Sequence, residues 1–174
     1  MRHLSRKIAL TTLATIFLVG IAMAQATSDP VLLKAKEETL VVFDLGRMFG
    51  YLDDMVKDGK TAALTSDQLK KIYDIMGEIR SLKRVEPAKA KVLLTQIEDR
   101  ILTPSQLMAT DKLAAVGAVT RTANQGSGPG ANGGTSPLAS YVAGGDFNPI
   151  LDKTKTMGKD FLSFYAFVSK KLGK

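Results

Sequence analysis

Two short stretches of the 174-residue chain decide the fold, because they mark where two helices begin: LTSDQL at residues 64–69 and LTPSQL at residues 102–107. In each copy, a threonine is followed three positions later by a glutamine. A threonine at a helix N-cap accepts a hydrogen bond from the backbone N–H three residues on, and a glutamine at that third position accepts one from the N-cap N–H. Both copies therefore predict a capping box and the start of a helix.

Every fixed letter of the repeat has a place in this capping motif. The threonine and the glutamine form the box. The leucines stand before the cap and at the fourth helical position, where they can pack as a hydrophobic staple. We therefore interpret six residues as a structural helix-capping motif, not as binding residues: Leu64, Thr65, Gln68, Leu102, Thr103 and Gln106.

Apolar residues recur at helical spacing on both sides of the boxes. Residues 65–84 predict one amphipathic helix, and residues 87–101 predict a second that begins at Pro87, a favourable residue for a first helical turn. So short a break between two amphipathic helices predicts an antiparallel hairpin. A third helix is expected from Thr103 to about Val116.

An earlier helix is predicted after Pro30, with Ser28 or Asp29 as its cap and a stop at Gly59. Gly46 and Gly50 lie inside this helix and indicate a close helix contact or a kink. The helix carries one apolar stripe, made of Val42, Leu45, Phe49, Leu52 and Val56.

Composition changes at Gly117. Residues 117–147 hold eight of the fifteen glycines and predict a flexible linker or disordered loop. Residues 148–174 predict a C-terminal amphipathic helix, which can be interpreted in two ways. Its apolar stripe can complete the core, the interpretation we favour, since such stripes are most often core. It can also contact a membrane or a partner through Phe161, Phe164, Tyr165, Lys170 and Lys171.

The first 26 residues have the layout of a secretory signal peptide. Arg2, Arg6 and Lys7 precede an uncharged apolar run, and small residues follow it. We expect cleavage after Ala26; an uncleaved membrane anchor is the alternative. Either interpretation predicts an exported protein, periplasmic or extracellular, in the cell envelope.

Composition argues against most kinds of enzyme. The chain has no cysteine, and its one histidine, His3, lies in the leader, so the expected mature chain has neither residue. Most nucleophile–base pairs and transition-metal sites use one of these two side chains. Asp53, Asp54 and Asp58 suggest a cation site, but we interpret them as a solvated helix face. The sequence therefore predicts no catalytic residue, no cofactor, no metal site and no enzyme.

The charge of the chain also bears on its partners. The formal net charge is +7, and three of the 24 basic residues lie in the leader with none of the 17 acidic ones, which leaves the mature chain near +4. Both signs are interspersed along the helices. This modest bias is not typical of a nucleic-acid binder, so no nucleic-acid partner is expected.

The two L-T-x-x-Q boxes, in a small, helical, exported and cysteine-free chain, resemble the LTxxQ-motif (Spy/CpxP-like) family of bacterial periplasmic proteins. The resemblance lies within residues 64–113. It implies a helical protein that binds unfolded clients without ATP or that modulates an envelope stress sensor. The six capping residues are the positions that carry over, as motif positions.

Together, these features predict an all-α protein. Residues 27–116 form a small helical bundle built from antiparallel helix hairpins, followed by the Gly-rich linker and the C-terminal helix. The leading hypothesis is a non-enzymatic interaction protein, chaperone-like or part of an envelope stress response. It would bind a protein partner or unfolded client through adaptable apolar side chains, with these methionines as candidates: Met48, Met55, Met76, Met108 and Met157.

The alternative hypothesis is a structural or membrane-peripheral envelope component, docked by its C-terminal helix and spaced by the linker. The two hypotheses differ in where the apolar stripe of residues 148–174 lies. The sequence does not predict the oligomeric state.

Overall fold

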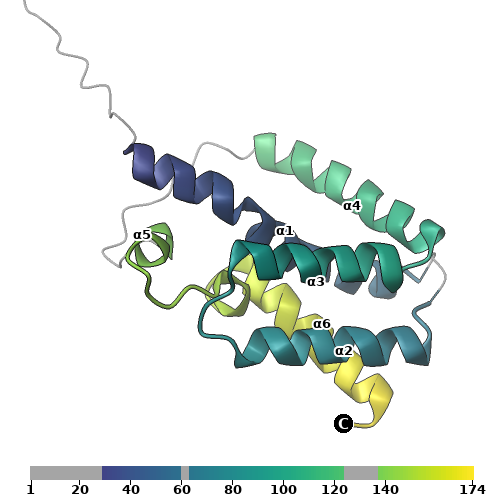
Figure 1. Ribbon diagram of the computed structural model, residues 1–174. Helices are drawn as coiled ribbons and strands as arrows, with labels where there is room; N and C mark the ends of the chain where they lie inside the picture. The colour runs from purple at the N-terminus through teal and green to yellow at the C-terminus, as the bar shows by residue number, and fades with distance from the viewer. Residues whose placement is uncertain (1–28, 60–62, 124–136) are drawn as a thin grey trace, which may run out of the picture.

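A computed structural model describes residues 29–59, 63–123 and 137–174. These residues are all-α, as predicted, and contain no strand. The helices are α1 (Pro30–Asp58), α2 (Ser66–Ser81), α3 (Pro87–Arg100), α4 (Pro104–Ala123), α5 (Pro137–Val142), the 3-10 turn η1 (Pro149–Leu151) and α6 (Thr156–Leu172). They pack as a helical bundle (Figure 1). The predicted signal peptide, residues 1–26, lies outside the described residues.

The longest helix, α1, is the centre of the bundle. It begins as the sequence predicts, with the Asp29 carboxylate accepting the Val31 N–H at 2.9 Å and Pro30 in the first turn. It ends at Gly59, whose φ of 65° lies in the left-handed region that glycine adopts without strain. Between these ends, α1 contacts α3, α4, α5, η1 and α6. Its apolar stripe is therefore shared by most of the molecule.

The core combines the apolar faces of four helices. Val42, Leu45, Phe49 and Leu52 of α1 are completely buried. Phe49 meets Phe161 of α6 edge to face, with 5.1 Å between ring centroids, a favourable aromatic geometry. The other completely buried apolar residues of these four helices are Ile72, Met76, Ile79, Ala90, Ile97, Phe161, Phe164 and Val168.

Helices α2 and α3 are antiparallel, as expected for a hairpin, but they do not pack mainly on each other. The two helices run in opposite directions from a short connection (Figure 1), and an ion pair joins Glu78 to Lys89. Each buries its apolar face elsewhere, however: α2 packs mainly on α6, and α3 mainly on α1. The bundle is therefore held together by α1 and α6, which lie outside the predicted hairpin.

The boundary predicted at Gly117 is wrong. Helix α4 continues to Ala123, seven residues beyond Val116. One glycine in an alanine-rich stretch costs only about 1 kcal/mol and does not end a helix. The predicted linker is also interrupted at its other end, where residues 137–142 form α5 and Phe147 is buried. Residues 124–136, with most glycines of the expected linker, lie outside the described residues.

The single helix expected over residues 148–174 is divided. The chain makes the turn η1, then a second turn in which the Asp152 carboxylate accepts the Thr154 N–H, before α6 begins at Thr156. The α6 helix ends at Gly173, again in the left-handed region, with φ of 68°. In the part of the chain described, no helix combines the length and the hydropathy needed to cross a bilayer.

Two side chains fasten the segment before η1 to the end of α2. Arg84 Nη1 donates to the backbone oxygens of Tyr141 and Gly145, and its guanidinium lies 4.4 Å from the Tyr141 ring centroid. Asn148 Nδ2 donates to the oxygens of Ile79 and Leu82, at 2.9 and 2.8 Å. These bonds hold the segment before η1 against the end of α2.

Gly46 marks a close helix contact, one of the two interpretations left open. A Cβ at Gly46 would lie 2.1 Å from Met157 Sδ of α6, and one at Gly50 would lie 3.2 Å from Asp160 Oδ2. At Gly158 a Cβ would lie equally close, 2.1 Å, to the backbone oxygen of Asp152, which cannot move aside as a side chain can. The absence of side chains at these glycines lets α1, η1 and α6 approach one another.

Candidate functional site

The two capping boxes meet at one point of the structure. Thr65 Oγ1 accepts the Gln68 N–H at 3.2 Å, and Gln68 Oε1 accepts the Thr65 N–H at 2.9 Å. The same pair of bonds joins Thr103 and Gln106, at 3.3 and 2.9 Å. The capping geometry predicted for both copies is therefore present.

The glutamines then bond to each other across the junction, a contact that spacing alone does not predict. Gln68 Nε2 donates to Gln106 Oε1 at 2.8 Å and to the Ile101 backbone oxygen at 2.6 Å. Gln106 Nε2 donates to Gln68 Oε1 at 3.4 Å and to the Ala63 oxygen at 3.3 Å. Both side chains are buried, and a buried amide is stable only when its polar atoms are paired.

The leucines of the motif support this junction. Leu64, Leu69 and Leu102 are buried, and Leu107 is half-buried against the core. The structure thus brings all six motif residues to the starts of α2 and α4. Since their polar atoms bond to one another, the junction stabilises the fold and leaves little with which to bind a ligand.

The C-terminal aromatic residues do not form a contact surface. Phe161 and Phe164 are completely buried, so the membrane or partner contact considered for them is wrong in this fold. Their side of α6 packs on α1 and α2, because the bundle needs a fourth apolar face to close its core. Lys170 and Lys171 are exposed on the last turn of α6.

Tyr165 is half-buried and forms a polar contact between α6 and α2. Its hydroxyl donates to the Tyr73 hydroxyl at 2.9 Å, and the two rings stack with centroids 5.2 Å apart. Arg80 lies 4.2 Å from the Tyr165 centroid, and Lys174 Nζ lies 4.1 Å from that of Tyr73. Stacked rings flanked by cations stabilise this helix pair.

Most of the candidate methionines belong to the core. Met48, Met55 and Met76 are buried, and Met157 is half-buried against Gly46. Only Met108, on α4, is exposed, at 59%. A methionine-rich contact surface is therefore not formed by these five residues.

A groove of about 740 Å³ lies between α1, α4 and α6, and we call it the α4 groove. Phe43 and Tyr51 of α1, Leu113 and Val116 of α4, and Met157 of α6 contribute its apolar walls. Val116 is 66% exposed, the highest value among the large apolar residues described. An apolar groove of this size is typical of a ligand or peptide site.

Charged side chains border the α4 groove. Asp54, Asp152 and Asp160 stand with Arg47 and Lys155 along its edge. Burial, with the nearby carboxylates of Asp54 and Asp53, raises the pKa of the Asp160 carboxyl above its usual range. The rim therefore carries both signs of charge, and Asp54 is close enough to Asp160 to raise its pKa.

Asp53 is buried. The solvated helix face that the sequence suggested for it is therefore wrong at this residue. Its Oδ2 accepts from Lys57 Nζ at 2.5 Å, and the same ammonium donates to Ser163 of α6 at 3.2 Å. The hydrogen bond to Asp53 raises the pKa of Lys57. Among the described residues, no cluster of three or more His, Cys, Asp or Glu side chains could hold a metal ion.

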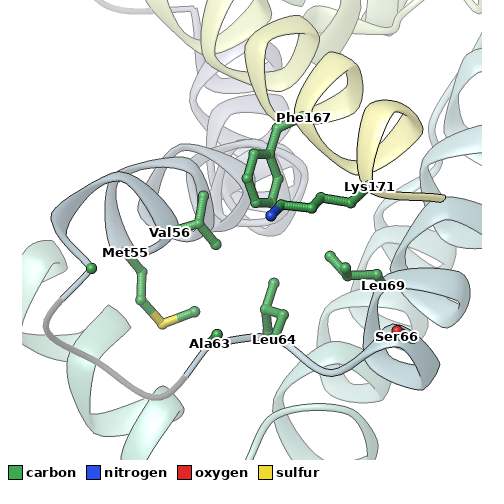
Figure 2. Close-up of a pocket in the computed structure, with 9 residues that line it drawn as sticks. Met55, Val56, Ala63, Leu64, Ser66, Leu69, Phe167 and Lys171 are labelled. Atoms are coloured by element: carbon green, nitrogen blue, oxygen red, sulfur yellow. The ribbon is translucent and has the colours of Figure 1, made fainter. Parts of the chain in front are cut away.

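A second, smaller pocket of about 390 Å³ lies where α2 begins, and we call it the α2 pocket. Figure 2 shows Met55, Leu64, Leu69 and Phe167 around its interior, with the Lys171 side chain extending beside the Phe167 ring. Its walls come from the ends of α1 and α6 and from the start of α2.

Comparison with known proteins gives no name to these features. Neither the protein-family models, nor the curated proteins, nor the solved structures compared with the chain contain a match.

Sequence reasoning missed both concave surfaces. Phe43 and Asp160 are 117 positions apart, and no local motif joins them. The nearest signal is the pair Gly46 and Gly50, which indicated a close contact on the face of α1 that borders the groove. The partner helix of that contact could not be named, since several apolar stripes fit equally well.

Proposed function

We propose that this chain is an exported, non-enzymatic helical binding protein that holds an apolar segment of another protein in the α4 groove. The observation that carries the proposal is the groove itself, with apolar walls and a charged rim. Such a surface can bury apolar side chains of a partner while the rim stays in water.

The position of Val116 supports this use of the groove. This valine, 66% exposed at the wall of the groove, presents apolar surface that a bound segment would cover. Contiguous exposed apolar surface in a soluble domain is typical of a contact site. The resemblance of the two capping boxes to the LTxxQ-motif family supports a chaperone-like activity without ATP. The boxes themselves would serve as scaffold.

The membrane-docking alternative has lost its main support. It depended on an apolar face of residues 148–174 turned outward, and Phe161 and Phe164 of that face are buried. We therefore propose a protein segment as the partner and not a lipid surface.

The proposal can be tested with residues 27–174, which contain every residue that the structure describes. Reduced, carboxymethylated α-lactalbumin, which stays unfolded, serves as the client, and light scattering of a second, aggregating client gives the activity. We expect saturable binding and suppressed scattering without ATP. Val116→Asp should weaken both binding and suppression at least several-fold, because an apolar segment in the groove would then have to cover a charged carboxylate.

A matched control comes from α3. Val92 is 59% exposed, a fraction similar to that of Val116, and it does not line the groove. Val92→Asp adds the same charge to a similar position and should leave binding unchanged. Equal losses in the two variants, or no suppression by the unaltered protein with several clients, would contradict the proposal.

A further inference from the structure

The α2 pocket combines apolar walls with one charged side chain. Met55, Leu64 and Leu69 are buried, and Val56 and Phe167 are half-buried against the core. Among the described residues that line the pocket, only Lys171 is charged. Figure 2 shows its ammonium group at the pocket, beneath the Phe167 ring.

Among the residues described, Lys171 has no ion-pair partner. Two other lysines are paired with acids, Lys57 with Asp53 and Lys71 with Asp67. Lys171 Nζ lies 5.7 Å from the centroid of the Phe167 ring. The pocket lies near one helix start and two helix ends, so the helix dipoles do not supply a net positive charge, and an anion there would depend on Lys171.

This combination fits an amphiphile better than a peptide. A pocket of about 390 Å³ is near the lower limit of ligand sites, roughly 300 to 1,000 Å³, and is too small for a folded segment. A flexible alkyl chain can follow apolar walls of this kind, and a carboxylate at one end can accept hydrogen bonds from an ammonium group.

We propose that the α2 pocket binds a single-chain amphiphile with an anionic head, of the class of medium-chain fatty carboxylates. The alkyl chain lies against Met55, Leu64 and Phe167, and the head group pairs with Lys171. This site shares no lining residue with the α4 groove, so its proposal stands or fails independently of the function proposed above.

The test is calorimetric titration of residues 27–174 with decanoate below its micelle concentration. We expect saturable binding of one decanoate per chain. Lys171→Glu should weaken it at least tenfold by reversing the charge at the head group. Lys170→Glu is the matched control, because it makes the same change at an exposed neighbour that does not line the pocket, and it should alter the affinity less than twofold.

Two further probes separate the pocket from general charge effects. Decyltrimethylammonium, with the same tail and a cationic head, should bind at least tenfold more weakly than decanoate. Ala63→Leu, an addition at an exposed residue of the pocket wall, should weaken decanoate binding while the helical circular dichroism stays unchanged. The proposal is overturned if decanoate does not saturate, if both lysine variants lose affinity equally, or if the cationic probe binds as tightly.

Discussion

Two buried glutamines illustrate how much one side chain does in this fold. Each amide oxygen accepts the N–H of its own cap, and each amide nitrogen donates to the other glutamine and to a backbone carbonyl. One pair of side chains therefore caps two helices and joins them. The repeated L-T-x-x-Q-L is explained by this junction.

Removing one glutamine should leave its partner unsatisfied. Gln106→Ala is expected to lower the free energy of unfolding by about 1–3 kcal/mol, because the Gln68 amide and the Thr103 N–H lose a buried partner. Urea denaturation followed by circular dichroism measures the loss. Gln96→Ala, at a half-buried glutamine of α3 with no bond to another side chain in the described region, should cost less than about 0.5 kcal/mol.

A double-mutant cycle tests whether the two boxes act as one unit. Because Gln68 and Gln106 share hydrogen bonds, Gln68→Ala and Gln106→Ala should be non-additive, with a coupling energy of roughly 0.5–3 kcal/mol. Strict additivity would show that the contact contributes nothing beyond two separate caps.

Asp160 gives the fold a predictable pH dependence. Its pKa is raised in the folded state, mainly by burial and then by Asp54 and Asp53, so the folded protein holds this proton more tightly than the unfolded chain. The resulting stabilisation is complete below the ordinary aspartate pKa and is lost as pH rises through the raised value. At neutral pH, the ionised carboxylate therefore costs stability.

Asp160→Asn should accordingly raise the urea midpoint at pH 7, and its advantage should shrink as the pH falls through the carboxylate range. Asp74→Asn, at an exposed aspartate of α2, is the control for the chemical change itself. A midpoint for Asp160→Asn that is lower than that of the unaltered protein at pH 7 would contradict the assignment.

At the scale of the helices, glycines decide which elements can touch. Gly158 is buried against the backbone of Asp152, so the turn before α6 closes only because this position has no Cβ. Gly77 of α2, by contrast, has no atom within 4 Å of the place a Cβ would take. A side chain is therefore excluded at Gly158 and tolerated at Gly77.

The two glycine-to-alanine changes should therefore have opposite signs. Gly158→Ala should lower the free energy of unfolding by about 1–3 kcal/mol, since backbone atoms must move to admit the methyl group. Gly77→Ala should raise it by about 0.5–1 kcal/mol, because alanine has the higher helix propensity and fits without strain. Thermal unfolding of both variants decides the matter, and a destabilised Gly77→Ala would count against the packing described for α2.

For the whole molecule, α6 is the helix that joins the first two helices. It contacts both α1 and α2, and its buried Phe161 packs edge to face on Phe49 of α1. Removing its apolar face would open α1 and α2 at once. The helices should therefore unfold together and not one hairpin at a time.

Phe161→Ala should lower the free energy of unfolding by about 3–5 kcal/mol, as expected for truncating a fully buried aromatic residue. Far-ultraviolet circular dichroism, which reports helix, and near-ultraviolet circular dichroism of the tyrosines should share one midpoint in the unaltered protein. Leu40→Ala, at a leucine that is 48% exposed, should cost less than about 0.5 kcal/mol. Two separate midpoints would show that α6 is a separate unit.

The sequence by itself determined the local structure of this protein: the all-α class, the caps at Thr65 and Thr103, a helix start at Pro30 capped by Ser28 or Asp29, and the apolar faces of the helices. These features depend on residues within one or two helical turns, so spacing and side-chain chemistry suffice to predict them. The end of α4 was predicted wrongly, because helix ends depend on small free energies that one glycine does not decide.

Only the tertiary structure decided which faces meet. It paired Gln68 with Gln106, packed α2 on α6, buried Phe161 and Phe164, and left the α4 groove and the α2 pocket open. Each of these helix contacts joins residues at least 38 positions apart. The groove and the pocket form between helices that such contacts hold together. Apolar stripes have no directional preference for a particular partner, so the choice belongs to the packing of the whole chain.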